Sequence, residues 1–330
     1  AGSRNLYLGR AAGQPENRRA ERRDRQRTEL GAKRIGCMSR MTFDLALKLG
    51  RVSNLPTVWT NCIAGIVLAG GIVADVRTLL VILALSLFYV GGMFMNDAYD
   101  AEIDAIERPE RPIPSGQISQ TTVFNCAYGM MGGSVFLLLL IGFLPSNGTG
   151  SWPALCGLVL AGLIVLYNRH HKGNPISPLI IGLCRVLVYI TAGICFVAAL
   201  GTPLLVGAAL LVSYLIGLTY VAKQENFGSV ENMWPLLFLA APILYGLYLA
   251  VDSAIIWPFW LVFIFWIFVA LYFIKRRGPG DIPRAVVSLI AGICLLDAIM
   301  IASTGNIVWA IVAVVAFGLT LLLQKYVAGT

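Results

Sequence analysis

The chain has 330 residues, of which 58% are apolar and only 13% are charged, and its net charge is +8. An ordinary soluble domain has roughly 45–50% apolar and about 25% charged residues. The composition excludes a typical soluble enzyme and predicts a multi-pass protein whose solvent is the lipid bilayer.

The N-terminal segment differs from the rest of the chain. The first 37 residues hold ten Arg or Lys, four Asp or Glu and no long apolar run. These residues form either a disordered extension or a basic arm that binds anionic lipid headgroups. A third alternative is that translation starts at Met38 or Met41. No signal peptide is predicted, because no apolar core follows the early arginines. We divide the chain into a basic extension over residues 1–40 and a transmembrane domain over residues 41–330.

Nine or ten apolar segments follow, each close to the ~20 residues that cross a bilayer. They are 55–74, 79–98, 121–143, 152–168, 178–199, 204–222, 234–251, 256–274, 284–303 and 306–326. The joints at 200–203 and 303–306 are short and nearly uncharged, so each is a tight hairpin or a break within a longer helix. We prefer ten spans, which leave both termini on the inner side.

Basic residues orient the predicted bundle. After position 37, thirteen of 15 basic residues lie before the first span, at alternate joints or at the end of the chain. Loops rich in Lys and Arg stay in the cytoplasm, so these joints are predicted to be cytoplasmic. His170 and His171 lie at one of them, where interfacial solvation is the simplest role.

Motifs of other functional classes are missing from the sequence. It contains no Walker loop, no GxGxxG after a strand and no HExxH. Its seven cysteines show no metal-binding spacing and suit helix packing. Nucleotide-driven transport by this chain alone is therefore not expected, and no nucleic-acid partner is predicted.

The second predicted span ends in an acidic cluster with the pattern NDxxDxxxD. Asn96, Asp100 and Asp104 recur every four residues, and Asp97 lies three residues before Asp100, so all four share one face if the helix continues. Like charges at this spacing repel, so a cation in front of them explains the pattern. Mg²⁺ is typically held by one or two carboxylates together with substrate phosphates. We therefore predict a metal site formed by these four residues.

Basic residues follow the cluster. Arg108 and Arg111 precede or open the segment RPIPSG at 111–116, whose prolines and glycine disfavour a helix. Basic groups beside a carboxylate–Mg²⁺ site complete a diphosphate clamp. The alternative is a solvated helix end and a polar loop, but ionisable groups near membrane depth are costly and usually functional.

The acidic motif and its RPxPSG continuation resemble the first Asp-rich motif of the UbiA superfamily of intramembrane prenyltransferases. The stretch from Arg51 to Thr57, which includes Asn54, resembles the RxxNxxT of the family's first helix. The resemblance extends from about residue 48 to the C-terminus. It implies an all-helical transmembrane bundle around a central cavity that opens toward the inner leaflet. It also implies Mg²⁺ dependence and a polyprenyl diphosphate donor.

The polar end of the fourth helix also matches the family. Tyr167-Asn168 with Lys172 resembles that part of the pattern. With Asn54 and Asn96 as ligands or orienting groups, Arg108, Arg111 and Lys172 are expected to neutralise the leaving diphosphate. Mg²⁺ on the Asp residues would assist cleavage of the donor C–O bond as a Lewis acid.

The family's second Asp-rich motif, approximately DxxYxxxD, is incomplete. Tyr220 matches, but Gly217 and Gln224 stand where carboxylates are expected, and Glu225 and Glu231 are the nearby acids. The two motifs of the family hold the diphosphate through Mg²⁺ ions, so a site for one ion or for two remains open here.

Lys223 offers a physical replacement for part of this motif. Its ammonium would contact the diphosphate as a point charge, with Glu225 as a weaker ligand. The alternative is an inner-loop positive charge without a catalytic role.

The segment YVAKQE at 220–225, Arg185 in the fifth span and Asp297 in the ninth look most like the EboC subgroup. That subgroup occurs in bacterial gene clusters for secondary metabolites, which implies a bacterial inner membrane and an active site facing the cytoplasm. Arg185 and Asp297 form either an ion pair or polar contacts in the cavity.

Aromatic residues in the spans have two interpretations. Four tyrosines either shield a carbocation with their π faces or pack and anchor the helices. They are Tyr128, Tyr167, Tyr189 and Tyr214.

The leading hypothesis is a Mg²⁺-dependent prenyltransferase that acts on an aromatic or related lipophilic acceptor. The rival is a transporter or lipid-binding accessory protein that kept the fold and one diphosphate grip without turnover. The incomplete second motif favours the rival, and the intact first motif favours the enzyme.

Overall fold

The computed structural model describes residues 41–223, 234–327 and 329, and it describes Lys223 by its backbone only. These residues form helices and no strand, as the sequence predicts. The predicted extension over residues 1–40 lies outside them. The α-helices are α2 (Phe43–Leu49), α3 (Leu55–Leu68), α4 (Val76–Glu107), α5 (Gln120–Phe143), α6 (Trp152–His170), α7 (Ser177–Ile194), α8 (Thr202–Lys223), α9 (Ala240–Asp252), α10 (Trp257–Arg276), α11 (Asp281–Ala302) and α12 (Ile307–Leu323).

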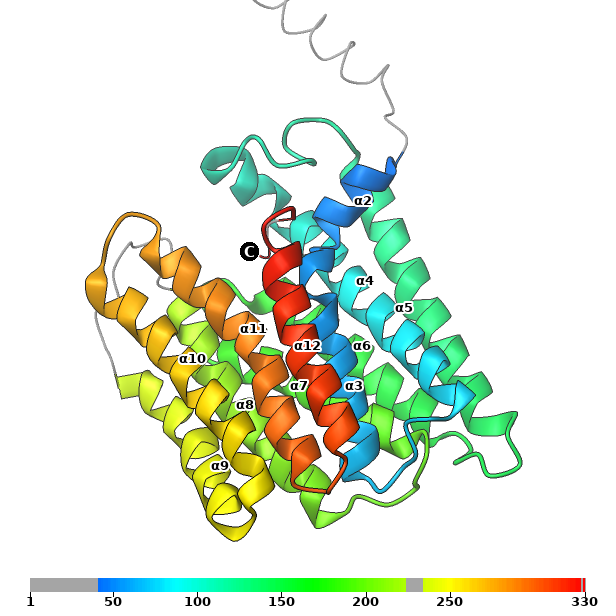
Figure 1. The fold of residues 1–330 in the computed structure, drawn as a ribbon. Helices are drawn as coiled ribbons and strands as arrows, with labels where there is room; N and C mark the ends of the chain where they lie inside the picture. Colours follow the sequence, from blue (N-terminus) through cyan, green and yellow to red (C-terminus); the bar gives the residue numbers. More distant parts are fainter. Residues whose placement is uncertain (1–40, 224–233, 328, 330) are drawn as a thin grey trace, which may run out of the picture.

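The helices α3 to α12 correspond one for one to the ten predicted spans. In the described part of the chain, eight helical segments are long and apolar enough to cross a membrane, and two apolar segments, Val52–Leu68 and Ile307–Leu323, are shorter. The protein is therefore a multi-pass integral membrane protein. Figure 1 shows α2 and the C-terminal end of α12 at the same end of the bundle, as an even number of traverses requires.

Local signals set the helix boundaries. A proline within the first turn opens α3, α6, α7 and α10, where the missing N–H costs no hydrogen bond. Asp75 caps α4 by accepting the backbone N–H of Arg77 at 2.8 Å, and it also binds the guanidinium at 2.7 Å. These hydrogen bonds from Arg77 hold the pKa of Asp75 below its usual range. Gly305, at φ +82°, allows the tight turn between α11 and α12.

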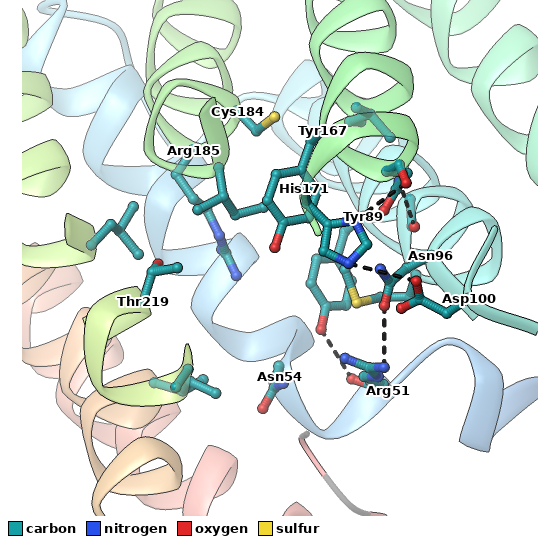
Figure 2. Close-up of a pocket in the computed structure, with 18 of the residues that line it drawn as sticks. Arg51, Asn54, Tyr89, Asn96, Asp100, Tyr167, His171, Cys184, Arg185 and Thr219 are labelled. Carbon is teal, nitrogen blue, oxygen red and sulfur yellow. Dashed lines mark hydrogen bonds and ion pairs between the residues drawn. The ribbon is translucent and has the colours of Figure 1, made fainter. Parts of the chain in front are cut away.

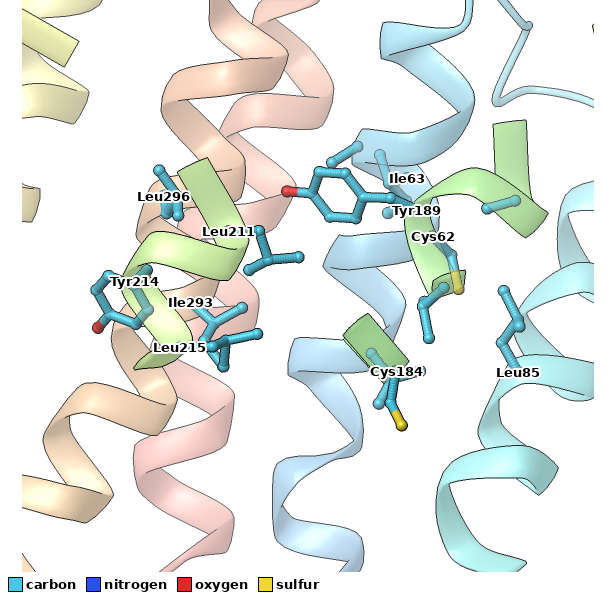
Figure 3. Packing of buried hydrophobic residues seen from close by; sticks show 14 of the residues in the cluster. Cys62, Ile63, Leu85, Cys184, Tyr189, Leu211, Tyr214, Leu215, Ile293 and Leu296 are labelled. Atoms are coloured by element: carbon cyan, nitrogen blue, oxygen red, sulfur yellow. The ribbon is translucent and has the colours of Figure 1, made fainter. Parts of the chain in front are cut away.

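Helix α11 forms the centre of the bundle. In its most apolar stretch 89% of the residues are buried, against 28% for the α10 segment. It contacts α3, α8, α10 and α12. Leu211 and Leu215 of α8 lie near Ile293 and Leu296 of α11 in Figure 3. The peripheral helices instead turn large apolar side chains outward, toward lipid.

Helices α3 and α7 cross at very close range. A Cβ atom added at Gly65 would lie 2.3 Å from the carbonyl oxygen of Tyr189, and one added at Gly193 would lie 2.9 Å from the carbonyl oxygen of Gly65. Small residues permit such an approach, which is a common means of helix association in membranes. The crossing places polar residues of α3 beside α7.

We expect Gly65→Ala to lower the thermal stability of the purified protein. The new methyl group would meet backbone atoms of α7, and overpacking of this kind costs about 1–3 kcal/mol. The measurement is the midpoint of thermal unfolding in detergent. Gly132→Ala is the matched control, because a Cβ at that α5 position meets no atom within 4 Å. Equal midpoints for the two variants would contradict the close crossing.

Candidate active site

A cavity of about 870 Å³ lies among α3, α4, α6, α7, α8 and α11. Figure 2 shows side chains from these helices converging on it. Apolar side chains form much of the wall, while charged residues gather where α4, the loop after it and the end of α6 meet. The charged residues in the lining are Arg51, Asp100, Asp104, Glu107, Arg108, Arg111, Lys172 and Arg185.

Helix α4 runs through the whole acidic cluster and ends at Glu107. Its face toward the cavity presents Asn96, Asp100 and Asp104, the three residues that recur every four positions. Asp100 is 8% exposed and Asp104 is 4% exposed. Asp97 is equally buried but does not line the cavity. Three of the four predicted residues therefore share the cavity face, whereas Asp97, which was expected on the same face, does not line the cavity.

Two arginines hold Asp97. Arg51 donates from Nη2 to its Oδ1 at 3.1 Å, and the Nη1 of Arg111 lies 3.6 Å from the same oxygen. Arg51 also donates to Oδ1 of Asn96 at 3.4 Å. Its backbone is left-handed, at φ 43°, which is uncommon for a residue other than glycine. Arg51 was not among the predicted site residues, although it opens the RxxNxxT stretch.

Arg111 links the loop after α4 to the acidic face. Its Nη1 donates to Oδ2 of Asp104 at 2.8 Å. Its own carbonyl accepts the N–H of Ser115 at 2.9 Å and the hydroxyl of Ser115 at 2.7 Å, so the RPIPSG segment is a compact turn. The loop thereby brings a guanidinium back onto the helix from which it emerges.

Asp100 is paired from α6 and the residues after it. The Nζ of Lys172 lies 3.2 Å from its Oδ1, and Nε2 of His171 lies 3.6 Å from the same atom. His171 Nδ1 donates to the carbonyl of Asn168 at 3.2 Å, and the ring stacks on Tyr167 at 5.1 Å. Sequence reasoning assigned His171 to interfacial solvation, whereas the structure places it in the cavity lining.

The acidic face is thus neutralised by cations from three other segments. In the described residues, no three Asp, Glu, His or Cys side chains come together as a ready metal site. The donor chemistry nevertheless suits Mg²⁺, because carboxylate oxygens of Asp100 and Asp104 line the cavity with the amide of Asn96. Asn168 also lines the cavity, and its buried Oδ1 has no hydrogen-bond partner among the described residues. These residues fit a hard cation once the ion pairs open.

Helix α8 contributes a different wall. Its lining residues are Leu215, Leu218, Thr219 and Ala222, so the described part of α8 presents no carboxylate to the cavity. Gly217 instead faces Leu239, whose Cγ would lie 2.9 Å from an added Cβ.

The three other candidates of the second motif are Tyr220, Lys223 and Glu225. Tyr220 packs against the hydrophobic core and does not line the cavity. The side chain of Lys223 and all of Glu225 lie outside the described residues.

Arg185 and Asp297 are not a direct ion pair. Arg185 donates to Oδ1 of Asn61 at 2.9 Å and to Oγ1 of Thr57 at 3.1 Å. Asn61 in turn donates from Nδ2 to Oδ2 of Asp297 at 2.8 Å, and the hydroxyl of Tyr189 binds the other carboxylate oxygen. Asp297 is fully buried and does not line the cavity, whereas Arg185 does.

One of the four candidate tyrosines reaches the cavity, namely Tyr167. Tyr128 is 49% exposed on α5. Tyr189 and Tyr214 are buried, and the Tyr214 hydroxyl donates to the carbonyl of Leu289 at 2.7 Å. Tyr89, which the sequence did not single out, lines the cavity.

Asn54 and Arg108 also line the cavity. The Asn54 amide is bound by the C-terminal segment: it donates to the carbonyl of Gly329 at 2.9 Å and accepts from Gln324 Nε2 at 2.9 Å. Its polar atoms are therefore already paired.

Comparisons with known proteins agree with this architecture. Residues 58–189 match the UbiA prenyltransferase family. A digeranylgeranylglyceryl phosphate synthase of Methanobrevibacter smithii is 33% identical over 178 residues, which are 52% of this chain and 59% of that protein. Another, from Metallosphaera sedula, is 34% identical over 131 residues, 39% of this chain and 43% of that protein. The chain thus spans about half the length of these curated relatives.

A solved UbiA homologue from Aeropyrum pernix shares the fold, with a TM-score of 0.58 and 14% identity over 76% of this chain and 97% of the other. The family match over residues 58–189 begins within α3 and ends within α7, so it includes the acidic face of α4. Residues 58–189 are therefore similar to the UbiA prenyltransferase family, and the helical bundle around them has the fold of a UbiA homologue.

Proposed function

We propose that this chain is a Mg²⁺-dependent intramembrane prenyltransferase that takes its prenyl group from a polyprenyl diphosphate. The observation that carries the proposal is the charged end of the cavity. There Asp100 and Asp104 lie beside Arg111 and Lys172, while the rest of the wall is mostly apolar. A diphosphate with an isoprenoid tail has the same division into an anionic head and an apolar chain.

The metal-holding residues in this proposal are Asn96, Asp100 and Asp104. Mg²⁺ bound there supplies Lewis-acid withdrawal of charge from the diphosphate. Asp97 instead orients Arg51 and Arg111, whose guanidiniums bind phosphate oxygens bidentately. Arg111 and Lys172, which pair with Asp104 and Asp100, would neutralise the oxygens of the leaving diphosphate.

Prenyl transfer breaks the bond between C1 of the prenyl group and the diphosphate oxygen, and the electron pair leaves with the diphosphate. A nucleophilic atom of the acceptor forms the new bond to C1 and loses a proton. The apolar walls exclude water from the developing allylic cation. Tyr89 and Tyr167 line this space, and their aromatic rings are of the kind that stabilises a nearby cation.

The acceptor class rests on two lines of support. Similar proteins are named digeranylgeranylglyceryl phosphate synthases, which favours a prenylated glycerol phosphate. The leading hypothesis from the sequence is instead an aromatic or related acceptor, and the EboC resemblance adds only a link to secondary metabolism. A bacterial inner membrane and a cytoplasmic active site stay predictions from that resemblance and from the basic joints.

One observation favours the non-catalytic alternative, a membrane protein that binds or transports a diphosphate lipid. The described part of α8 offers the cavity apolar side chains and one hydroxyl, Thr219, so the grip on a diphosphate rests on the α4 side. Diphosphate-lipid binding without product would support this alternative.

Asp100→Asn is expected to lower prenyl transfer about 100- to 1,000-fold, as removal of a key electrostatic group at a reacting centre does. The assay combines purified protein in nanodiscs, Mg²⁺ and radiolabelled geranylgeranyl diphosphate with each acceptor class. Glu102→Gln is the matched control, since Glu102 lies on the same helix, is exposed and does not line the cavity. Product formation that survives Asp100→Asn would reject the proposed site.

Asp97→Asn is expected to act differently from Asp104→Asn. Loss of the Asp97 charge releases Arg51 and Arg111 from their shared carboxylate, so the KM for the donor should rise about tenfold. The Mg²⁺ concentration for half-maximal activity should stay unchanged in Asp97→Asn and rise in Asp104→Asn. Mg²⁺ titration of both variants measures this. An equal rise in both would show that Asp97 is itself a metal ligand.

A further inference from the structure

Arg185 lies in the cavity apart from the acidic face, and within the described part of the chain its hydrogen bonds go to uncharged groups. The guanidinium has five N–H donors. Among the described residues it donates to the Asn61 amide and the Thr57 hydroxyl, and its Cζ lies 5.5 Å from the centre of the Tyr89 ring. Figure 2 shows the side chain pointing from α7 into the pocket. A cation is thus presented to the cavity without a carboxylate in contact.

Asp297 does not pair directly with this cation, because the Asn61 amide lies between them. Its two carboxylate oxygens are bound by the Tyr189 hydroxyl and by Nδ2 of Asn61. Asn61 therefore turns its amide nitrogen toward Asp297 and its oxygen toward Arg185. The amide is fixed by the carboxylate behind it and orients the guanidinium in front of it.

Position along the helices separates Arg185 from the diphosphate grip. Tyr89, which Arg185 covers, precedes Asp100 by eleven residues on α4, a rise of about 16 Å. Arg185 follows the first residue of α7 by eight, a rise of about 12 Å from the basic end of the bundle. The two charged positions are therefore at different depths.

Beyond the polar contacts of Arg185, part of the cavity wall is apolar. Val58, Val188 and Leu218 line the same cavity, and Thr219 adds a hydroxyl. A cation at this depth is costly unless an anion or several hydrogen bonds compensate it. A carboxylate or phosphate bound by a guanidinium in such a setting gains a charge-assisted, geometrically specific contact.

We propose that Arg185 is a second anion site of the cavity, which binds the acid group of the acceptor while the diphosphate of the donor occupies the α4 face. The proposal rests on the proposed function and specifies its acceptor: it carries an acid group, either the carboxylate of an aromatic acid or the phosphate of a glycerol lipid. Asn61 and Asp297 are positioning residues for this site.

Binding to the full-length protein in nanodiscs tests the site without requiring turnover. Two acid probes are compared with their neutral counterparts: 4-hydroxybenzoate with its methyl ester, and geranylgeranylglyceryl phosphate with the dephosphorylated alcohol. Wild type should prefer one acid over its counterpart. Arg185→Gln should weaken binding of that acid about 10- to 100-fold and leave the neutral probe unaffected, because a hydrogen bond to a charged group is lost. Arg185→Lys should restore part of the preference.

Arg284→Gln is the matched control, because Arg284 is an arginine of the bundle that does not line the cavity. The aromatic and lipid arms identify the source of the acid group. No preference for either acid in wild type, or an equal loss for acid and neutral probes in Arg185→Gln, would overturn the proposal. Acid binding without product from any donor would leave the Arg185 site standing and reject the transferase function.

Discussion

The structure depends on keeping a row of negative charge at the end of a membrane helix. Asp97, Asp100 and Asp104 belong to α4, yet the cations that compensate them come from three other places: Arg51 before α3, Arg111 in the loop after α4, and Lys172 after α6. Buried carboxylates without partners are expensive, so these segments must meet for the bundle to close. The same ion pairs form the charged end of the cavity, and folding and substrate binding therefore use one set of contacts.

The sequence predicts most of this site where the signal is local. Asn96, Asp100 and Asp104 were placed on one helix face by their spacing alone, and α4 does continue through them. The ten apolar segments likewise appear as ten helices, because a run of apolar residues is itself the cause of a membrane helix. Arg111 was predicted as part of the clamp because it lies only seven residues from Asp104.

The parts that sequence reasoning missed depend on helices far apart along the chain. Arg51 reaches Asp97 across 46 residues, and Arg185 reaches Asn61 across 124. No periodicity within one segment reports such a contact. The sequence left open whether Arg185 and Asp297 pair directly for the same reason, since the intervening Asn61 becomes visible only when α3 packs between α7 and α11. Gly217 is a further case: its fit against Leu239 is tertiary packing and leaves no local pattern.

The two short apolar helical segments have a consequence for the surrounding lipid. Val52–Leu68 and Ile307–Leu323 each contain 17 residues, a rise of about 26 Å against ~30 Å of hydrocarbon. They belong to neighbouring helices, and α12 turns large apolar side chains such as Ile311 and Val315 outward. The apolar stretch that α12 presents to lipid is therefore short, and a short stretch is accommodated by thinning of the adjacent leaflets, by snorkelling of flanking residues or by oligomerisation. The thickness of the surrounding membrane therefore affects the energy of this face of the bundle even when no substrate is bound.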